Sequence, residues 1–215
     1  LAIELNLIAA TWNNIKTYYE TCEEQLDDTI INFIEKNIDD LISKPIGDKS
    51  FSNLSQHLFE AGSLSNNSYE KLCKAMNFVV SMTENILSLP EDKLIILIHS
   101  GSLPSSDESI EALANVSVRA TCEYILYDKA NLTHYLQTVP ITTELAEALL
   151  SNSGFNQEEF YKIIAVLDPN SVTVSQKLAD RLCSLLSIKY SVCDVNIFIK
   201  AINLCSNEDT AIMAA

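Results

Sequence analysis

Glycine and proline are scarce in this sequence, with only 4 Gly and 5 Pro among 215 residues. All-β folds need many tight turns, and those turns depend on these two residues. The scarcity therefore favours helices over a β-sandwich or barrel. Hydrophobic residues make up 47% of the chain and charged residues 20%. Such a composition is typical of a folded chain that buries a sizeable core, and it argues against disorder.

Basic residues are also few, because 29 Asp and Glu stand against 14 Lys and Arg, for a net charge of −15. Only Arg119 and Arg181 are arginines. A groove that follows nucleic-acid phosphates needs clustered Lys or Arg, so we expect neither nucleic acid nor an anionic membrane as a partner. The acidity has two interpretations: a solvated, self-repelling surface, or a docking face for a basic partner.

Long apolar runs are absent too. The longest, KLIILI at residues 93–98, is far shorter than the ~20 residues that span a bilayer. With no signal peptide and no initiator Met, we expect a cytoplasmic protein that does not enter the membrane. The chain begins in one apolar segment, LAIELNLIAA, and ends in another, TAIMAA. We therefore expect a piece excised from a longer polypeptide.

Motifs of catalysis and metal binding are missing as well. The six cysteines form no C-x-x-C pair and are expected to be buried thiols of a reducing compartment. The histidines, His57, His99 and His134, have no partner at zinc-binding spacing. Ser100 lies in HSGS at the end of a predicted helix, whereas a nucleophile elbow needs a preceding strand. The sequence therefore predicts no enzyme and no catalytic, cofactor-binding or metal-binding residue.

Three acidic doublets could suggest paired carboxylates: Asp27 with Asp28, Asp39 with Asp40, and Glu158 with Glu159. Neighbouring residues on a helix diverge by about 100°, so each doublet is expected to solvate a face or a helix start. Tyrosines at helical spacing are expected to be half-buried, although tyrosine is also enriched at interfaces. They are Tyr18, Tyr19, Tyr124, Tyr127 and Tyr135.

Apolar residues recur at intervals of three and four along most of the chain, which predicts short amphipathic helices. The expected helices cover 11–22, 28–42, 51–62, 68–78, 90–101, 105–114, 118–128, 131–139, 141–154, 156–167, 174–188, 194–206 and 207–215, while 83–89 is ambiguous. Thr11 and Asn156 are expected N-caps, Pro90 is expected in a first helical turn, and Gly101 is expected to end a helix. Ser105 or Ser106 is expected to start the next helix, with Ser105 and Glu108 at capping-box spacing.

Such short helices must stack on neighbours, because none can bury its apolar face alone. We predict an all-α fold of stacked helical hairpins, an irregular HEAT-like α-solenoid, with a compact irregular helical bundle as the alternative. We expect residues 1–215 to form a single domain, with a possible subdivision near 43–50.

Several phrases of the chain carry a resemblance. TWNNIKTYY, LDDTIINFIEKNIDDLI, EDKLIILIHSGSLPSSDESIEAL and IIAVLDPNSVTVSQKLADRLCSLL are similar to the helical C-terminal region of large bacterial P-loop NTPases of the YobI type. The resemblance implies a bacterial protein whose nucleotide-binding domain lies upstream. This chain has no G-x-x-x-x-G-K-[ST] motif, so no catalytic residue carries over.

The sequence thus leads to three functional hypotheses. The first is a non-catalytic protein-interaction or sensor module of a larger NTPase, which binds a protein partner or the upstream domain of its own polypeptide. The second is an acidic decoy or inhibitor that binds a basic partner. An independent enzyme is the third, and it would need a pocket with converging His, Asp or Cys side chains.

Overall fold

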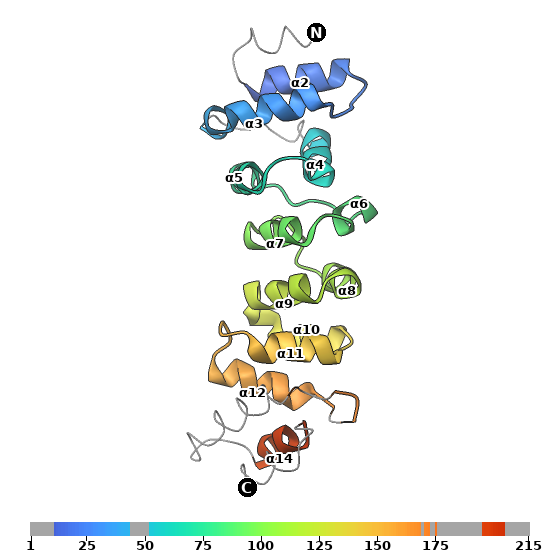
Figure 1. The fold of residues 1–215 in the computed structure, drawn as a ribbon, viewed down its shortest axis with the longest axis vertical. Helices are drawn as coiled ribbons and strands as arrows, with labels where there is room; N and C mark the ends of the chain where they lie inside the picture. The colour runs from blue at the N-terminus through green and yellow to red at the C-terminus, as the bar shows by residue number, and fades with distance from the viewer. Residues whose placement is uncertain (1–10, 44–51, 169, 173–174, 176–194, 205–215) are drawn as a thin grey trace. The chain divides into compact units, whose positions relative to one another are not determined.

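The computed structural model describes residues 11–43, 52–168, 170–172, 175 and 195–204, and its regular structure there is entirely helical (Figure 1). The predicted all-α class is therefore confirmed. The helices are α2 (Trp12–Thr21), α3 (Asp28–Ile42), α4 (Ser52–Ala61), α5 (Asn66–Met76), α6 (Glu84–Leu87), α7 (Glu91–His99), α8 (Asp107–Val116), α9 (Val118–Tyr127), η2 (Lys129–Asn131), α10 (Leu132–Thr138), α11 (Thr143–Ser151), α12 (Gln157–Val166) and α14 (Val195–Leu204).

The chain divides into two compact units, residues 1–109 and 110–215, with the boundary inside the first turn of α8. The expectation that residues 1–215 form a single domain stays a prediction. The expected subdivision near 43–50 falls outside the described residues, except for Ser43. The helices expected at 174–188 and beyond Leu204 also lie outside them.

Polar caps define several helix starts. Thr11 precedes α2 and accepts the Asn14 N–H at 3.3 Å, as expected. Asn156 precedes α12 and forms a full capping box with Glu159, with the two bonds at 2.7 and 3.0 Å. Both caps satisfy backbone donors that a helix leaves unpaired in its first turn.

Two details of the helix starts differ from the predictions, at α7 and at α8. Pro90 is the N-cap of α7, one position before the first helical turn where it was expected. Ser106, and not Ser105, caps α8: the helix begins at Asp107, and the Ser106 hydroxyl accepts the Ser109 N–H. The capping box expected from Ser105 was therefore wrong, because the helix starts one residue later than that spacing requires.

In the first unit, helices pack on the next helix but one. α3 packs on α5, α5 on α7, and α4 on α6, while α2 packs on α3. The predicted apolar faces form this core, and Trp12 donates its indole N–H to the Leu41 carbonyl at 3.1 Å. Gly62 ends α4 in the left-handed region (φ +59°), where a β-carbon would meet Leu89 at 2.6 Å. A larger residue would therefore be strained there.

The second unit repeats this packing. α9 contacts α11, α10 contacts α12, and α12 contacts α14. Leucine, isoleucine and aromatic side chains on the predicted faces fill its core: Ile125, Leu136, Leu145, Leu149, Leu150, Phe160, Ile163 and Ile164. Next-but-one packing is the arrangement expected of stacked helical hairpins, and the choice between solenoid and bundle stays a prediction.

Candidate functional site

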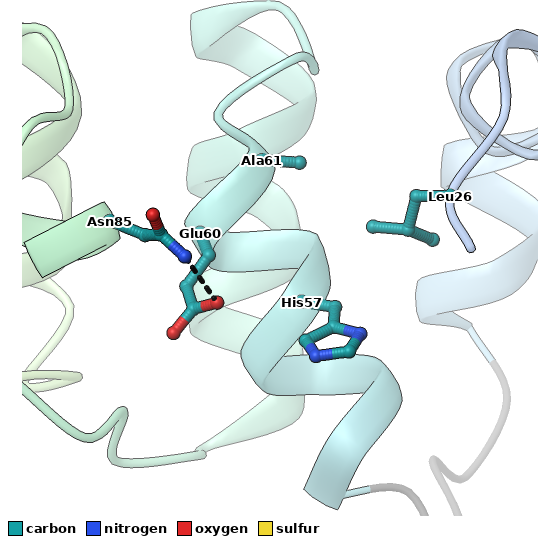
Figure 2. A pocket seen from close by; sticks show the side chains of 5 residues that line it. All are labelled: Leu26, His57, Glu60, Ala61 and Asn85. Atoms are coloured by element: carbon teal, nitrogen blue, oxygen red, sulfur yellow. Dashed lines mark hydrogen bonds between the residues drawn. The ribbon is translucent and has the colours of Figure 1, made fainter. Parts of the chain in front are cut away.

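A shallow hollow of about 400 Å³ lies on the surface of the first unit, and we call it the α4 pocket. It is lined by Leu26, His57, Glu60, Ala61 and Asn85 (Figure 2). Three of these residues come from one helix, α4, at positions that helical periodicity brings to one side. Leu26 comes from the turn between α2 and α3, and Asn85 from α6. The pocket therefore depends on three separate segments being packed together.

Glu60 carries the negative charge of the α4 pocket. Its carboxylate accepts hydrogen bonds from the Gln56 amide at 2.7 Å, the Thr83 hydroxyl at 2.7 Å and the Asn85 amide at 3.3 Å. Partial burial acts to raise the pKa of Glu60, but these three donors outweigh it and hold the pKa below its ordinary value. Glu60 is thus an ionised, fixed acceptor at neutral pH.

The rest of the α4 pocket wall is also held by side chains. The Gln56 side-chain amide forms two hydrogen bonds with the backbone of Ser81: its oxygen accepts the Ser81 N–H at 2.8 Å, and its nitrogen donates to the Ser81 carbonyl at 3.2 Å. His57 is hydrogen-bonded through Nδ1 to the Tyr19 hydroxyl, which links α4 to α2. The Nδ1 atom of His57 is therefore bonded to a phenol, where a catalytic triad has a carboxylate.

Five acidic residues surround the turn between α2 and α3, and we call this segment the acidic turn: Glu20, Glu23, Glu24, Asp27 and Asp28. Glu23 and Glu24 both have left-handed backbone angles, φ +55° and +58°, which is uncommon for side chains with a β-carbon. Lys16 pairs with Glu20 at 3.6 Å. Since Leu26 belongs to this turn, the acidic turn borders the α4 pocket.

A lysine is buried beneath the surface of the first unit. Lys93 is 5% exposed and donates to the Leu64 carbonyl, and its ammonium lies 4.4 Å from the centre of the Tyr69 ring. Burial lowers the pKa of Lys93, although the charge of Glu35 opposes that shift. We call these residues the Lys93 clamp: Lys93, Leu64, Tyr69, Glu35 and the N-cap residue Ser65.

Glu35 approaches the start of α5 from α3. Its carboxylate accepts the Ser65 N–H at 2.5 Å, the Ser65 hydroxyl at 3.1 Å and the Ser68 hydroxyl at 2.6 Å. The Lys93 clamp therefore joins α3, α5 and α7, which are the helices that pack on one another in the first unit.

The histidines and Ser100 do not form a site. His57, His99 and His134 are exposed and lie on α4, α7 and α10. Ser100 is the C-cap of α7 and donates its hydroxyl to the Ile96 carbonyl at 2.7 Å, which is the helix-end role expected for it. Within the described ranges, no group of three or more His, Cys, Asp or Glu side chains could hold a metal ion.

Members of the acidic doublets cap helices or pair with lysines. Asp27 caps α3 through the Ile30 N–H at 2.9 Å. Asp39 pairs with Lys71 at 2.5 Å, and Glu158 pairs with Lys162 at 2.8 Å while Glu159 completes its capping box. Glu158 and Glu159 therefore serve different partners.

Cysteines and tyrosines mostly serve packing. Cys73 and Cys122 are buried, and burial raises the pKa of their thiols to about 12 and about 11. Cys22 is a half-buried free thiol, and the other three cysteines lie outside the described residues. Of the five tyrosines considered as interface residues, four are buried and Tyr127 is 56% exposed.

Sequence reasoning missed both Lys93 and the polar network of Glu60. A signal for Lys93 was present, since Lys93, Leu94, Leu97 and Ile98 share one helical face and are all buried. For Glu60 there was no such signal, because its donors lie four residues away and twenty-three or more residues away.

No family model, no curated protein and no solved structure matches this chain. Across the described residues, no helix has both the length and the apolar character needed to cross a membrane.

Proposed function

We propose that this chain is a non-catalytic protein-interaction module, whose helices offer an acidic surface to a protein partner. The observation that carries the proposal is the packing of each unit. Several helices pack on the next but one, which is the contact pattern of stacked hairpins, and a stack of hairpins would leave faces free for a partner. Extended surfaces of this kind suit protein partners better than small substrates.

The residues that could have served catalysis support the same proposal. The three histidines lie on three different helices, and the α4 pocket, which contains His57 and Glu60, is lined by no described Ser, Thr or Cys that could act as a nucleophile. From the resemblance in the sequence, we further propose that the partner is the nucleotide-binding part of a bacterial NTPase, in the same polypeptide or assembled with it.

A second candidate, an acidic decoy for a basic protein, is favoured by the charge of the first unit. Residues 1–109 hold 17 acidic and 7 basic residues, whereas residues 110–215 hold 12 and 7. Five of the acids lie within the acidic turn, so charge of one sign is concentrated over a short segment.

The test is affinity capture at 150 mM salt with the 215-residue chain as bait. The control bait carries Glu20→Gln, Glu23→Gln and Glu24→Gln. The proposal predicts one protein that binds in stoichiometric amount and that re-forms the complex when both components are purified. A nucleic-acid enzyme as that partner would favour the decoy, and an NTPase domain would favour the module. If the purified chain forms no complex with any captured protein, the interaction function is wrong.

A further inference from the structure

We propose that the α4 pocket is an anchoring site for an arginine side chain of a basic protein partner. This inference rests on the proposed interaction function, and it adds the place and the chemistry of one contact. Within the part of the chain that the structure describes, the pocket is lined by one carboxylate and by no Lys or Arg. A cation is therefore attracted to it and an anion is repelled.

The carboxylate of Glu60 has capacity left for a ligand. An ionised carboxylate offers about four acceptor sites, and three donors, from Gln56, Thr83 and Asn85, reach Glu60. Those donors also fix the orientation of the carboxylate. A ligand that binds there does not have to order this side chain, which reduces the entropic cost of binding.

The surroundings of Glu60 suit a guanidinium group more than an ammonium. Asn85 donates to Glu60 through its amide nitrogen, which leaves the amide oxygen as a second acceptor at the pocket rim. A planar guanidinium has donors in a fixed fork and can serve two acceptors at once. Leu26 and Ala61 also line the pocket and are apolar, so they can contact the methylene stem of the arginine.

The acidic turn adds long-range attraction. It borders the pocket through Leu26, and its glutamates at positions 20, 23 and 24 are exposed. Exposed charges of one sign raise the rate at which an oppositely charged partner arrives, while a fixed pocket selects where one side chain docks. The acidic turn alone would not choose a position, and the α4 pocket does.

The probe for this site is the capped peptide acetyl-Arg-Arg-Arg-Arg-amide, added to the ¹⁵N-labelled 215-residue chain at 150 mM NaCl. The side-chain amides of Asn85 and Gln56 donate to Glu60, so their NMR signals should shift saturably with the peptide. Glu60→Gln removes the charge and should weaken binding about tenfold or more, as expected for loss of a hydrogen bond to a charged group. Ala61→Leu fills the pocket without touching the Glu60 hydrogen bonds and should weaken binding similarly.

Glu84→Gln is the matched control, because it removes one exposed negative charge from α6 next to Asn85 without lining the pocket. It should leave the affinity within about twofold of the parent chain, as expected for one screened surface charge. The proposal is overturned if the two amides do not respond, if Ala61→Leu binds like the parent, or if Glu84→Gln weakens binding as much as Glu60→Gln. Should Glu60→Gln unfold, Ala61→Leu decides alone. If a captured partner bound Glu60→Gln and Ala61→Leu with the affinity of the parent chain, the arginine-anchoring site would be refuted. The proposed interaction function would not be affected by that result.

Discussion

The two units contain the same arrangement of lysine, carbonyl, aromatic ring and glutamate, with the lysine buried in the first unit and half-buried in the second. In the first unit, the ammonium of Lys93 donates to the carbonyl of Leu64, which lies just before α5. The same ammonium lies over the ring of Tyr69, which belongs to α5. Glu35 takes the backbone N–H of the N-cap residue of that helix, Ser65. The carbonyl before a helix and the N–H of its cap are thus both satisfied by charged side chains.

The second unit has a counterpart before α12, which we call the Lys129 clamp. Lys129 donates to the Gly154 carbonyl at 2.5 Å and lies 5.8 Å from the centre of the Phe155 ring. Glu159 takes the N–H of the N-cap residue, Asn156, at 2.7 Å, and its carboxylate lies 3.6 Å from Lys129.

The two clamps differ in burial and in reach. Lys93 is 5% exposed, whereas the Lys129 side chain is 35% exposed. Glu35 comes from another helix, thirty residues away, while Glu159 belongs to the helix that it caps. A buried charge that loses its partner is costly, whereas exposed pairs contribute little. The first clamp should therefore hold tertiary structure together, and the second should mainly define a helix start.

The largest effect is expected from Lys93→Ala. The substitution leaves the buried Leu64 carbonyl unpaired and opens a cavity beside Tyr69, so it should lower the free energy of unfolding by about 3 kcal/mol. Trp12, the single tryptophan, is buried in the first unit, so its fluorescence during urea unfolding reports that unit. A loss below about 1 kcal/mol, the range of exposed pairs, would break the comparison.

Glu35→Gln should have the next largest effect. The amide keeps the shape of the side chain but presents N–H groups where Ser65 and Ser68 also donate, so it should cost about 1–2 kcal/mol. Its counterpart Glu159→Gln removes only a bond within one capping box and should cost less than about 1 kcal/mol. Urea midpoints followed by Trp12 fluorescence and by circular dichroism would measure both variants. If Glu35→Gln and Glu159→Gln lowered the free energy of unfolding equally, a glutamate that caps another helix would stabilise no more than one that caps its own helix.

The pH dependence of stability sharpens the role of Glu35. Partial burial acts to raise its pKa, but the serine donors and the charge of Lys93 outweigh this and hold the pKa below its ordinary value of 4.5. As pH falls, the unfolded state takes up the proton first, so the stabilisation is complete above about pH 5 and is lost as pH falls through the lowered pKa. Urea midpoints from pH 7 to pH 3 should fall less for Glu35→Gln than for the parent. The pKa of Glu60 is also lowered, so the stability of Glu35→Gln should still depend on pH to some extent. If the urea midpoint of Glu35→Gln fell with pH as steeply as that of the parent, this role of Glu35 would be refuted.

Much of this fold could be predicted from the sequence, because its helices are amphipathic and short. The spacing of Ile30, Phe33, Ile34 and Ile38 predicted the buried face of α3, and all four are buried. The caps at Thr11 and Asn156 followed from residue type and position. Such local signals depend on neighbours within one or two turns, which a single sequence contains.

The candidate site could not be predicted in the same way. Glu60 meets Thr83 and Asn85 only after α4 has packed on α6, and Leu26 reaches the pocket from another segment. Nothing in the sequence pairs these positions, because polar contacts between helices have no periodicity. The Ser105 capping box was wrong because α8 begins at Asp107, so Ser106 and not Ser105 is the residue before the helix.

The smallest effect is expected from Lys129→Ala, which should lower stability by less than about 1 kcal/mol because water can reach the half-buried Lys129 site and replace its ammonium. Cys73 and Cys122 are buried thiols, one in each unit, so their labelling by iodoacetamide at pH 8, read by peptide mass spectrometry, reports opening of each unit separately. Lys129→Ala should raise the labelling rate of Cys122 by less than about fivefold and leave Cys73 unchanged. Lys93→Ala should speed labelling of Cys73 by more than tenfold and leave Cys122 unchanged. If either substitution accelerated both cysteines equally, the units would open together, and the contrast between the clamps would belong to one cooperative structure.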